Sequence, residues 1–378
     1  MSPQSPVENR LPAHWPLRET SQFVVAGGWR WHLQRLGADA AEAPWLLLLH
    51  GTGGSTHEWA DVARSLAPRA HVLLCDLPGH GFTTPVQSGR MSAAGEAANA
   101  SASADASLSA EDAAQAQTND APNASDYSLI GMAAALAALP LHLLGCLPAR
   151  PILPEAPRLY VAGHSAGAAV ALQLAWMAAT EAKEAEPADN TVRGQSTVLS
   201  RLAGVVGVNP ALVPPPAAMV HGILPWLAPL TSSPVTRDVV QAAQRGLSRV
   251  PLLGAMQEAL GQVALTAILD STGSPLSEAS RQAYRTLFAE PRHVWCAMQM
   301  MAHWGLAALM PRLADLSCPV TLLVARDDPW IPVRALEALH REHPAWTWCE
   351  TTGGHLLPET SPALVARVIA EQCFRTNQ

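Results

Sequence analysis

The chain of 378 residues is 49% hydrophobic and 15% charged, which predicts a globular protein with a large core and an inserted subdomain. Its net charge of -7 at pH 7 and the lack of lysine and arginine clusters on predicted helices argue against a nucleic-acid partner. The six cysteines are scattered without a C-x-x-C pair, so neither a zinc site nor a disulfide framework is indicated. We expect no metal and no organic cofactor.

The N-terminal part of the chain alternates short apolar runs with a segment of helical length. After an N-terminal segment of residues 1–22, we expect strands within residues 23–36, 45–50 and 71–75, and a helix within residues 56–67. This alternation predicts a parallel, doubly wound α/β sheet. The first residues lack a basic stretch followed by an apolar one, as a secretion signal would have, so we expect a cytoplasmic location.

Residues 86–125 differ sharply in composition, because alanine, serine, glycine, amides and acidic residues dominate them and large apolar side chains are scarce. Such a segment cannot bury enough surface to offset the entropy lost on ordering, so we expect a disordered surface insertion without catalytic residues. A smaller polar insertion of the same kind is expected at Glu181–Ser200, before a strand at Ala203–Val208.

The stretch Leu129–Leu147 is almost uncharged and approaches the roughly 20 residues of a membrane span. Pro140 and Gly145 interrupt it. We therefore expect a buried helix capped by Asp126 or Ser128, and no transmembrane span.

The segment Gly163-His164-Ser165-Ala166-Gly167 lies between a short apolar run, Leu159–Ala162, and an apolar stretch of helical length, Ala168–Ala179. Glycine on both sides lets the backbone turn tightly from strand to helix, so that the serine hydroxyl projects from the edge of the sheet. Ser165 is the predicted nucleophile.

A serine hydroxyl needs an imidazole to take its proton and a buried carboxylate to orient that imidazole. His355 lies in a glycine-flanked loop ahead of a predicted terminal helix and is the predicted general base. The alternative is that it is an ordinary histidine of a surface loop.

The carboxylate is expected after the buried strand Val320–Ala325, because loops at the carboxyl ends of parallel strands build such sites. Two aspartates compete there. Asp328 is favoured over Asp327 because it stands four residues before Pro332, the usual spacing. Asp327 would then be a solvated neighbour of Arg326.

A predicted strand followed by a glycine-rich turn, residues 46–54, offers backbone N–H groups for an oxyanion. Thr52 N–H is the expected first donor, and Ala166 N–H, directly after the nucleophile, the second. The turn lacks the glycine spacing and the lysine of nucleotide-binding loops, which argues against a phosphate site. His50, Asp76 and His80 are interpreted as side chains that hold loops together.

Residues 210–316 leave the sheet and are expected to form a mostly helical cap over the serine. Its amphipathic segments are residues 217–229, 234–245, 251–269, 277–289 and 291–303. Trp226, Trp295, Met301 and Trp304 are the candidates for contact with an apolar substrate. The alternative for each of them is that it packs the cap on the core.

Several motifs, taken together, carry a family resemblance. They are His50-Gly51-Thr52-Gly53-Gly54-Ser55-Thr56-His57, Asp76-Leu77-Pro78-Gly79-His80-Gly81-Phe82-Thr83, Gly163-His164-Ser165-Ala166-Gly167-Ala168-Ala169, Gly207-Val208-Asn209-Pro210-Ala211-Leu212, Ser271-Thr272-Gly273-Ser274 and Met300-Met301-Ala302-His303-Trp304. Through them the chain resembles the α/β-hydrolase superfamily along nearly its whole length and, more narrowly, the magnesium-chelatase accessory proteins of bacteriochlorophyll biosynthesis. It departs from the pattern at Ala325, where a glycine is usual, and in the insertion at residues 86–125.

The resemblance implies an α/β-hydrolase fold, with a mostly parallel sheet flanked by helices in residues 23–209 and 317–378 and a cap in residues 210–316. It also implies a triad of Ser165, Asp328 and His355. The expected activity is that of a serine hydrolase forming an acyl-serine intermediate with an apolar ester, for example a porphyrin ester, in association with magnesium chelatase.

Two alternatives stay open at this point. The chain could be a non-catalytic factor that binds a porphyrin or the chelatase, using the hydrolase fold as a scaffold. It could also be a general cytoplasmic esterase or C–C bond hydrolase that resembles the pigment protein.

Overall fold

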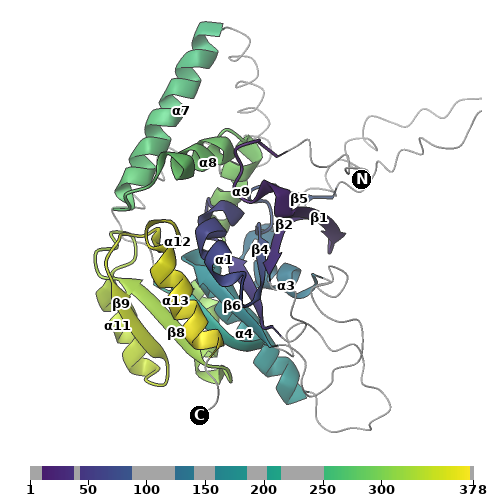
Figure 1. The fold of residues 1–378 in the computed structure, drawn as a ribbon, viewed down its shortest axis with the longest axis vertical. Helices are drawn as coiled ribbons and strands as arrows, with labels where there is room; N and C mark the ends of the chain where they lie inside the picture. The colour runs from purple at the N-terminus through teal and green to yellow at the C-terminus, as the bar shows by residue number, and fades with distance from the viewer. Residues whose placement is uncertain are drawn as a thin grey trace, which may run out of the picture.

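The computed structural model describes residues 11–37, 43–86, 124–139, 158–184, 202–213 and 251–374. A central sheet runs through them in the order β1-β2-β4-β3-β6-β7-β8-β9, and β5 pairs with β2 (Figure 1). The strands are β1 Ser21–Ala26, β2 Trp29–Gly37, β3 Trp45–Leu49, β4 His71–Cys75, β5 Thr84–Pro85, β6 Leu159–His164, β7 Leu202–Val208, β8 Val320–Ala325 and β9 Thr347–Thr351. From β4 to β9 neighbouring strands are parallel, and β2 pairs antiparallel with β1, β4 and β5.

Helices cover both faces of this sheet. The helices are α1 Ala60–Leu66, α3 Leu129–Ala137, α4 Ala166–Glu184, α7 Pro251–Ser271, α8 Glu278–Phe288, α9 Pro291–Ala302, α10 Leu306–Leu309, α11 Val333–Glu342, α12 Leu357–Thr360 and α13 Pro362–Cys373, with the 3-10 turns η2 Arg18–Thr20, η3 Thr56–Trp59, η4 Ala124–Tyr127 and η7 Met310–Asp315. Successive side chains of a strand point to opposite faces. Leu46 and Leu48 therefore pack with α1 and α13, while Leu47 and Leu49 pack with α3 and α4.

The expected strands and the helix after Ser165 are confirmed, with changes at their ends. Residues 23–36 fall in an antiparallel hairpin, β1 and β2, because Gly27 and Gly28 adopt the positive φ angles of a tight turn. The helix expected at residues 56–67 begins with the 3-10 turn η3. Helix α4 continues to Glu184 and so enters the predicted polar insertion.

The uncharged stretch after Ser128 begins as the predicted buried helix, α3, whose first turn Ser128 caps by accepting a hydrogen bond from Gly131 N–H at 3.0 Å. The rest of this stretch, and most of both predicted insertions, lie outside the described residues. Among the helices that the structure describes, none is both long and apolar enough to cross a membrane.

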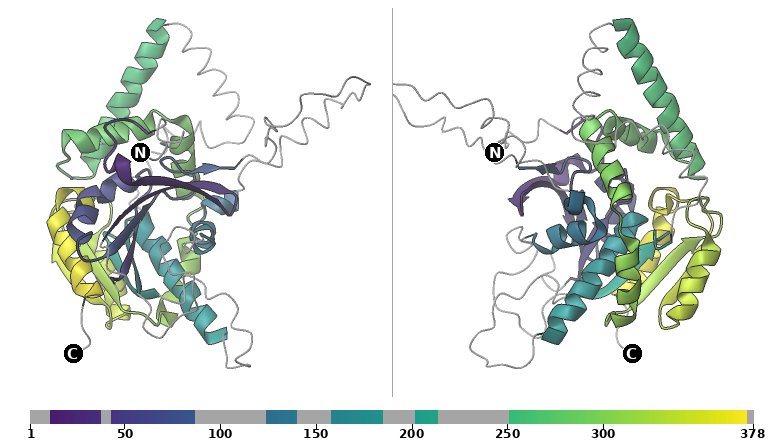
Figure 2. Two further views of the ribbon diagram at one scale, coloured as in Figure 1. Left: turned by 45° about the vertical axis from the view of Figure 1, so that its right-hand side comes forward. Right: turned by 180° about the vertical axis from the view of Figure 1, so that it is seen from behind.

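In the predicted cap, the segments expected at residues 251–269, 277–289 and 291–303 are the helices α7, α8 and α9. The other two expected cap segments, residues 217–229 and 234–245, lie outside the described residues. The views in Figure 2 show that α8 and α9 lie against the body of the protein, whereas α7 extends away from the sheet.

Asp76, directly after β4, organises the turn that follows. Its buried carboxylate accepts hydrogen bonds from His32 Nδ1 at 2.7 Å and Phe82 N at 2.8 Å on one oxygen. The other oxygen accepts from Ser55 Oγ at 2.7 Å and Thr56 N at 2.8 Å. Burial alone would raise the pKa of Asp76, but the nearby His32 ring and the hydrogen bonds from His32 and Phe82 outweigh burial and hold the pKa well below its usual range. The structure agrees with its interpretation as a loop-holding side chain.

Replacing Asp76 with alanine should lower the free energy of unfolding by about 3–5 kcal/mol, because a buried set of donors loses its charged acceptor. Chemical denaturation at neutral pH measures this change. Asp61→Ala is the control, since Asp61 is exposed on α1 and should change stability by no more than about 0.5 kcal/mol. Equal effects of the two substitutions would contradict the role assigned to Asp76.

Candidate active site

Ser165 lies on the tight turn between β6 and α4, with a backbone φ of 52° that residues other than glycine rarely adopt. The two flanking glycines are required by close contacts. A Cβ on Gly163 would lie 2.2 Å from the carbonyl oxygen of Gly167, and a Cβ on Gly167 would lie 2.3 Å from the carbonyl oxygen of Leu49. The turn therefore has the geometry expected of a nucleophile elbow.

The structure brings Ser165, His355 and Asp328 together. Ser165 Oγ lies 3.0 Å from His355 Nε2, and His355 Nδ1 lies 2.7 Å from Asp328 Oδ2. Because Asp328 Oδ2 can only accept as a carboxylate, Nδ1 carries the proton and Nε2 is left to accept the serine proton. His355 is 2% and Asp328 is 7% exposed, so water screens these contacts little.

The second oxygen of Asp328 accepts hydrogen bonds from Trp330 N at 2.7 Å and Ile331 N at 3.0 Å. Each oxygen of this carboxylate thus has a fixed partner, and its orientation toward the imidazole is set by the backbone of its own loop. Asp328 is the aspartate that contacts His355, as the spacing to Pro332 suggested.

The side chain of Asp327 is exposed to solvent, as expected, but its hydrogen bonds join it to the loop of His355 and not to Arg326. Asp327 accepts hydrogen bonds from Gly353 N at 2.9 Å and Gly354 N at 3.3 Å, so it ties its own loop to the loop of His355. Arg326 lies instead beside Glu350, at 3.6 Å. The two adjacent aspartates therefore hold the histidine loop through different atoms.

Burial lowers the pKa of His355 because it disfavours the charged ring. The hydrogen bond to Asp328 and the charge of Asp328 act in the opposite direction, while the nearby His164 ring lowers the pKa further. The net effect is a pKa below the usual histidine value, so that the ring is a free base at neutral pH.

Of the two predicted oxyanion donors, Thr52 lies in the glycine-rich turn after β3, and Ala166 is the first residue of α4, directly after Ser165. A Cβ on Gly51 would be 3.1 Å from Ser165 Cβ, so the glycine-rich turn approaches Ser165 closely. Neither Thr52 N–H nor Ala166 N–H has an acceptor among the residues that the structure describes. Thr52 Oγ1 donates to Met300 Sδ of α9 at 3.4 Å, which places a cap residue beside this turn.

His50 and His80 hold loops, as expected. His50 donates from Nδ1 to the Gly51 carbonyl at 2.7 Å and accepts from Leu77 N on Nε2 at 2.9 Å. His80 Nδ1 lies 3.1 Å from the Pro78 carbonyl.

The predicted substrate-binding side chains of the cap are only partly placed. Trp226 lies outside the described residues. Trp295 packs edge to face against Tyr127, and Trp304 packs against the core on the α4 side of the sheet. Met301 is half-buried on α9. These positions favour a packing role for the two tryptophans, and a role in substrate binding stays a prediction.

Two residues that the sequence reasoning did not single out also hold the triad. The ring of Trp330 lies 5.0 Å from that of His355, at an interplanar angle of 37°. Asn209, directly after β7, donates from Nδ2 to the carbonyl of His355 at 2.8 Å and accepts from Ala325 N at 2.7 Å. Its place at the carboxyl end of a parallel strand is the signal that could have identified it.

The turn that follows α7 holds the same loop from the cap side. His355 N donates to the Thr272 carbonyl at 2.9 Å, and Leu356 N donates to Ser274 Oγ at 2.8 Å. The histidine loop is therefore fixed by contacts from both the sheet and the cap.

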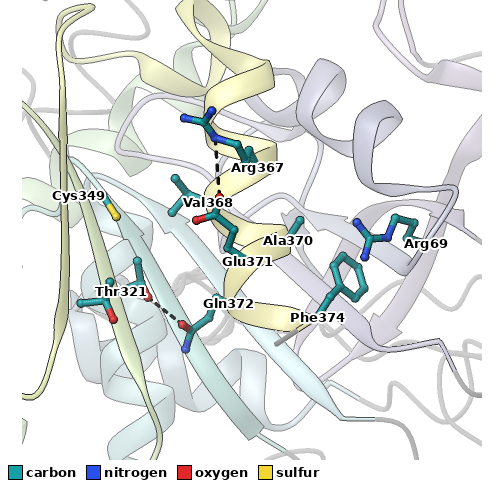
Figure 3. Close-up of a pocket in the computed structure, with 10 residues that line it drawn as sticks. Arg69, Thr321, Cys349, Arg367, Val368, Ala370, Glu371, Gln372 and Phe374 are labelled. Atoms are coloured by element: carbon teal, nitrogen blue, oxygen red, sulfur yellow. Dashed lines mark hydrogen bonds and ion pairs between the residues drawn. The ribbon is translucent and has the colours of Figure 1, made fainter. Parts of the chain in front are cut away.

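A cavity of about 590 Å³ lies elsewhere, between α13 and the first residues of β8 and β9 (Figure 3). Its walls include Arg69, Phe374 and Thr321, whose hydroxyl donates to Gln372 at 2.8 Å. The candidate site is at the opposite, carboxyl ends of these strands. Within the described part of the chain, no three histidine, cysteine or acidic residues are grouped to hold a metal ion.

Comparison with known proteins agrees with this architecture. The chain is 30% identical over 351 residues to the magnesium-chelatase 30 kDa subunit of Rhodobacter capsulatus, covering 93% of each protein. This similarity confirms the narrower resemblance seen in the motifs.

Solved structures show the same fold. An alpha/beta hydrolase fold protein from Burkholderia ambifaria aligns with a TM-score of 0.57 and 18% identity, over 93% of this chain and 99% of that one. A membrane phospholipase A aligns with a TM-score of 0.53 and 17% identity, over 92% of this chain and 84% of that one. The model of the alpha/beta hydrolase family matches residues 46–368. The chain therefore belongs to the alpha/beta hydrolase family.

Proposed function

We propose that this protein is a serine hydrolase that cleaves a carboxylic ester through an acyl-serine intermediate. The observation that carries the proposal is the unbroken hydrogen-bonded chain from Ser165 Oγ through the His355 ring to Asp328, at 3.0 and 2.7 Å. The strained backbone of Ser165 supports it, because such strain clusters at functional sites.

In the acylation step, Ser165 Oγ attacks the ester carbonyl while its proton passes to His355 Nε2. Asp328 holds the proton on Nδ1 and stabilises the imidazolium that forms. The N–H groups of Thr52 and Ala166 donate to the oxyanion of the tetrahedral intermediate. When the intermediate collapses, the C–O bond to the alcohol breaks and His355 gives its proton to the leaving oxygen.

In the deacylation step, His355 removes a proton from water as the water oxygen attacks the acyl-serine carbonyl. The second tetrahedral intermediate releases the carboxylic acid, and the proton returns to Ser165. These steps need no metal or organic cofactor.

We propose an apolar ester as the substrate, with a porphyrin ester as the specific candidate. Met300 beside Thr52 and Trp330 beside His355 supply apolar surface next to the triad. Substrate contact by Trp226, Trp295, Met301 and Trp304 stays a prediction. The similarity to a protein named as a magnesium-chelatase subunit supports a role in bacteriochlorophyll synthesis alongside that enzyme.

The same similarity favours a second candidate function. Because the relative is named as a subunit, the hydrolase fold could serve here as a scaffold that binds the chelatase or a porphyrin. The scaffold requires no reactive serine, so the two functions differ in one measurable property. A general esterase outside pigment synthesis would share that reactivity and would leave pigments normal in a Ser165→Ala strain.

Treatment of the purified protein with a fluorophosphonate probe should label Ser165. Ser165→Ala should abolish labelling and lower ester hydrolysis by roughly 10⁶-fold, because the nucleophile of a triad is removed. Ser65→Ala is the matched control, since Ser65 is exposed on α1 and should leave labelling unchanged. Wild-type protein that remains unlabelled would favour the scaffold.

Asp328→Asn should lower ester hydrolysis by roughly 10⁴-fold, because the amide favours the wrong tautomer of His355. Asp327→Asn should have a smaller effect, since Asp327 bonds only the backbone of the histidine loop. Steady-state kinetics of both variants on a chromogenic aryl ester measures the difference. A larger loss in Asp327→Asn would reverse the assignment of the acid.

The rate of fluorophosphonate labelling should fall with acidification, because only neutral His355 can accept the serine proton. Burial holds the pKa of His355 below its usual value, so the half-maximal rate should lie below about pH 6.5. Labelling rates measured across this pH range test the direction of the shift in the His355 pKa, and circular dichroism checks that the protein stays folded. A midpoint at or above that value would contradict the assigned environment of His355.

A further inference from the structure

A second histidine, His164, lies directly behind the proposed triad and has no place in the mechanism above. It is the last residue of β6, and its Nδ1 lies 2.9 Å from Glu58 Oε2 of η3. The side chains of His164 and Glu58 are 1% and 2% exposed. Two ionisable groups are thus completely enclosed within a few ångströms of the active site.

The partners of His164 determine its protonation. Its Nε2 lies 2.9 Å from the carbonyl oxygen of His355, which can only accept a hydrogen bond. Its Nδ1 faces the same oxygen of Glu58 that accepts from Gly51 N at 3.1 Å. The Gly51 N–H bond favours negative charge on that oxygen, so the arrangement favours a Glu58 carboxylate that accepts from His164 Nδ1. With Nε2 also donating, the His164 ring is then an imidazolium.

The electrostatics of the pair agree with this arrangement. Burial opposes charge on His164, but the Glu58 carboxylate and the hydrogen bonds to Glu58 and the His355 carbonyl outweigh burial and raise the pKa of His164. Burial likewise opposes charge on Glu58, yet the charge and hydrogen bond of His164 lower the pKa of Glu58 to about 2. Other ionisable groups that face the pair are His50, His57, Tyr284, Asp328, His355 and the buried carboxyl of Glu359.

The pair connects the three loops that the proposed reaction needs. Glu58 accepts from Gly51 N and so holds the glycine-rich turn that carries Thr52, and His164 immediately precedes Ser165. Through its Nε2, His164 holds the backbone of the general base, and its ring centroid lies 4.9 Å from that of His355. One buried ion pair therefore lies next to Ser165, the loop of His355 and the glycine-rich turn.

We infer that Glu58 and His164 form a permanent carboxylate–imidazolium pair that positions the loop of His355 and disfavours protonation of the His355 ring. The inference rests on the proposed hydrolase function. Both residues are positioning residues, since neither touches the reacting atoms. The ring centroids of His164 and His355 are 4.9 Å apart, and the repulsion from a positive His164 ring outweighs the attraction of the Glu58 carboxylate, so the pair adds to the effect of burial in disfavouring a charged His355 ring.

Nitrogen NMR of wild-type protein carrying ¹⁵N-labelled histidine tests directly whether the His164 ring is an imidazolium. With His164 assigned through its backbone, both ring nitrogens should show the chemical shifts of protonated nitrogen at about pH 7, where an ordinary histidine is mostly neutral. A neutral His164 ring under these conditions would overturn the inference, and the result does not depend on any enzymatic activity.

The effect of the pair on protonation of His355 is tested by following the titration of the His355 ring in wild-type protein and in Glu58→Gln. The amide cannot supply the carboxylate charge, so His164 should lose its extra proton and the His355 ring should titrate at higher pH. A purely structural role for Glu58 would leave the midpoint unchanged, and that result would overturn the inference. Thermal unfolding checks that the variant is folded. If the variant does not fold, the wild-type spectrum still decides whether His164 is charged.

Tyr284→Phe is the matched control. Tyr284 donates to Glu359 at 2.9 Å and reaches Glu58 at 3.4 Å, so its loss disturbs the same buried cluster without removing the Glu58 charge. It should leave the His355 midpoint unchanged, and a shift equal to that of Glu58→Gln would also overturn the inference. Failure of wild-type protein to react with a fluorophosphonate would remove the hydrolase function, while the titration would still decide the role of the pair.

Discussion

The conformation of Ser165 is the constraint on which the rest of the site depends. A serine with a φ of 52° turns its hydroxyl away from the sheet, and this turn exists only because Gly163 and Gly167 allow the strand and helix to pass within contact distance. The same turn places Ala166 N–H at the start of α4 and leaves the side chain of His164, at the end of β6, buried behind Ser165. The proposed nucleophile, one proposed oxyanion donor and one half of a buried pair are thus fixed by a single backbone geometry.

The proposed general base, His355, is held differently, because it lies in a loop with little regular structure. Its ring is fixed by Asp328, and its backbone accepts from or donates to Asn209, His164 and Thr272. These contacts come from the ends of three parallel strands and from the cap. A loop that is conformationally free in isolation is thereby ordered by charge-assisted and backbone hydrogen bonds that only the folded sheet can provide.

Much of the fold and the order of the triad could be predicted from the sequence, because apolar runs, the elbow around Ser165 and the spacing after β8 are local signals. Contacts between loops carried no local signal. The binding of Asp327 to Gly353 and of Glu58 to His164 depends on which strand ends become neighbours in the sheet, and that follows from topology. The cap could be predicted as helical, whereas the contacts of Trp295 and Trp304 depend on packing against the core.

The central claim is that Ser165 reacts with its oxyanion held by Thr52 N–H and Ala166 N–H. A crystal structure of the protein after reaction with a fluorophosphonate tests it most directly. The account predicts a covalent bond between Ser165 Oγ and phosphorus, with the phosphonyl oxygen about 2.7–3.1 Å from both backbone nitrogens. An adduct on another residue, or a phosphonyl oxygen directed away from both N–H groups, would contradict it.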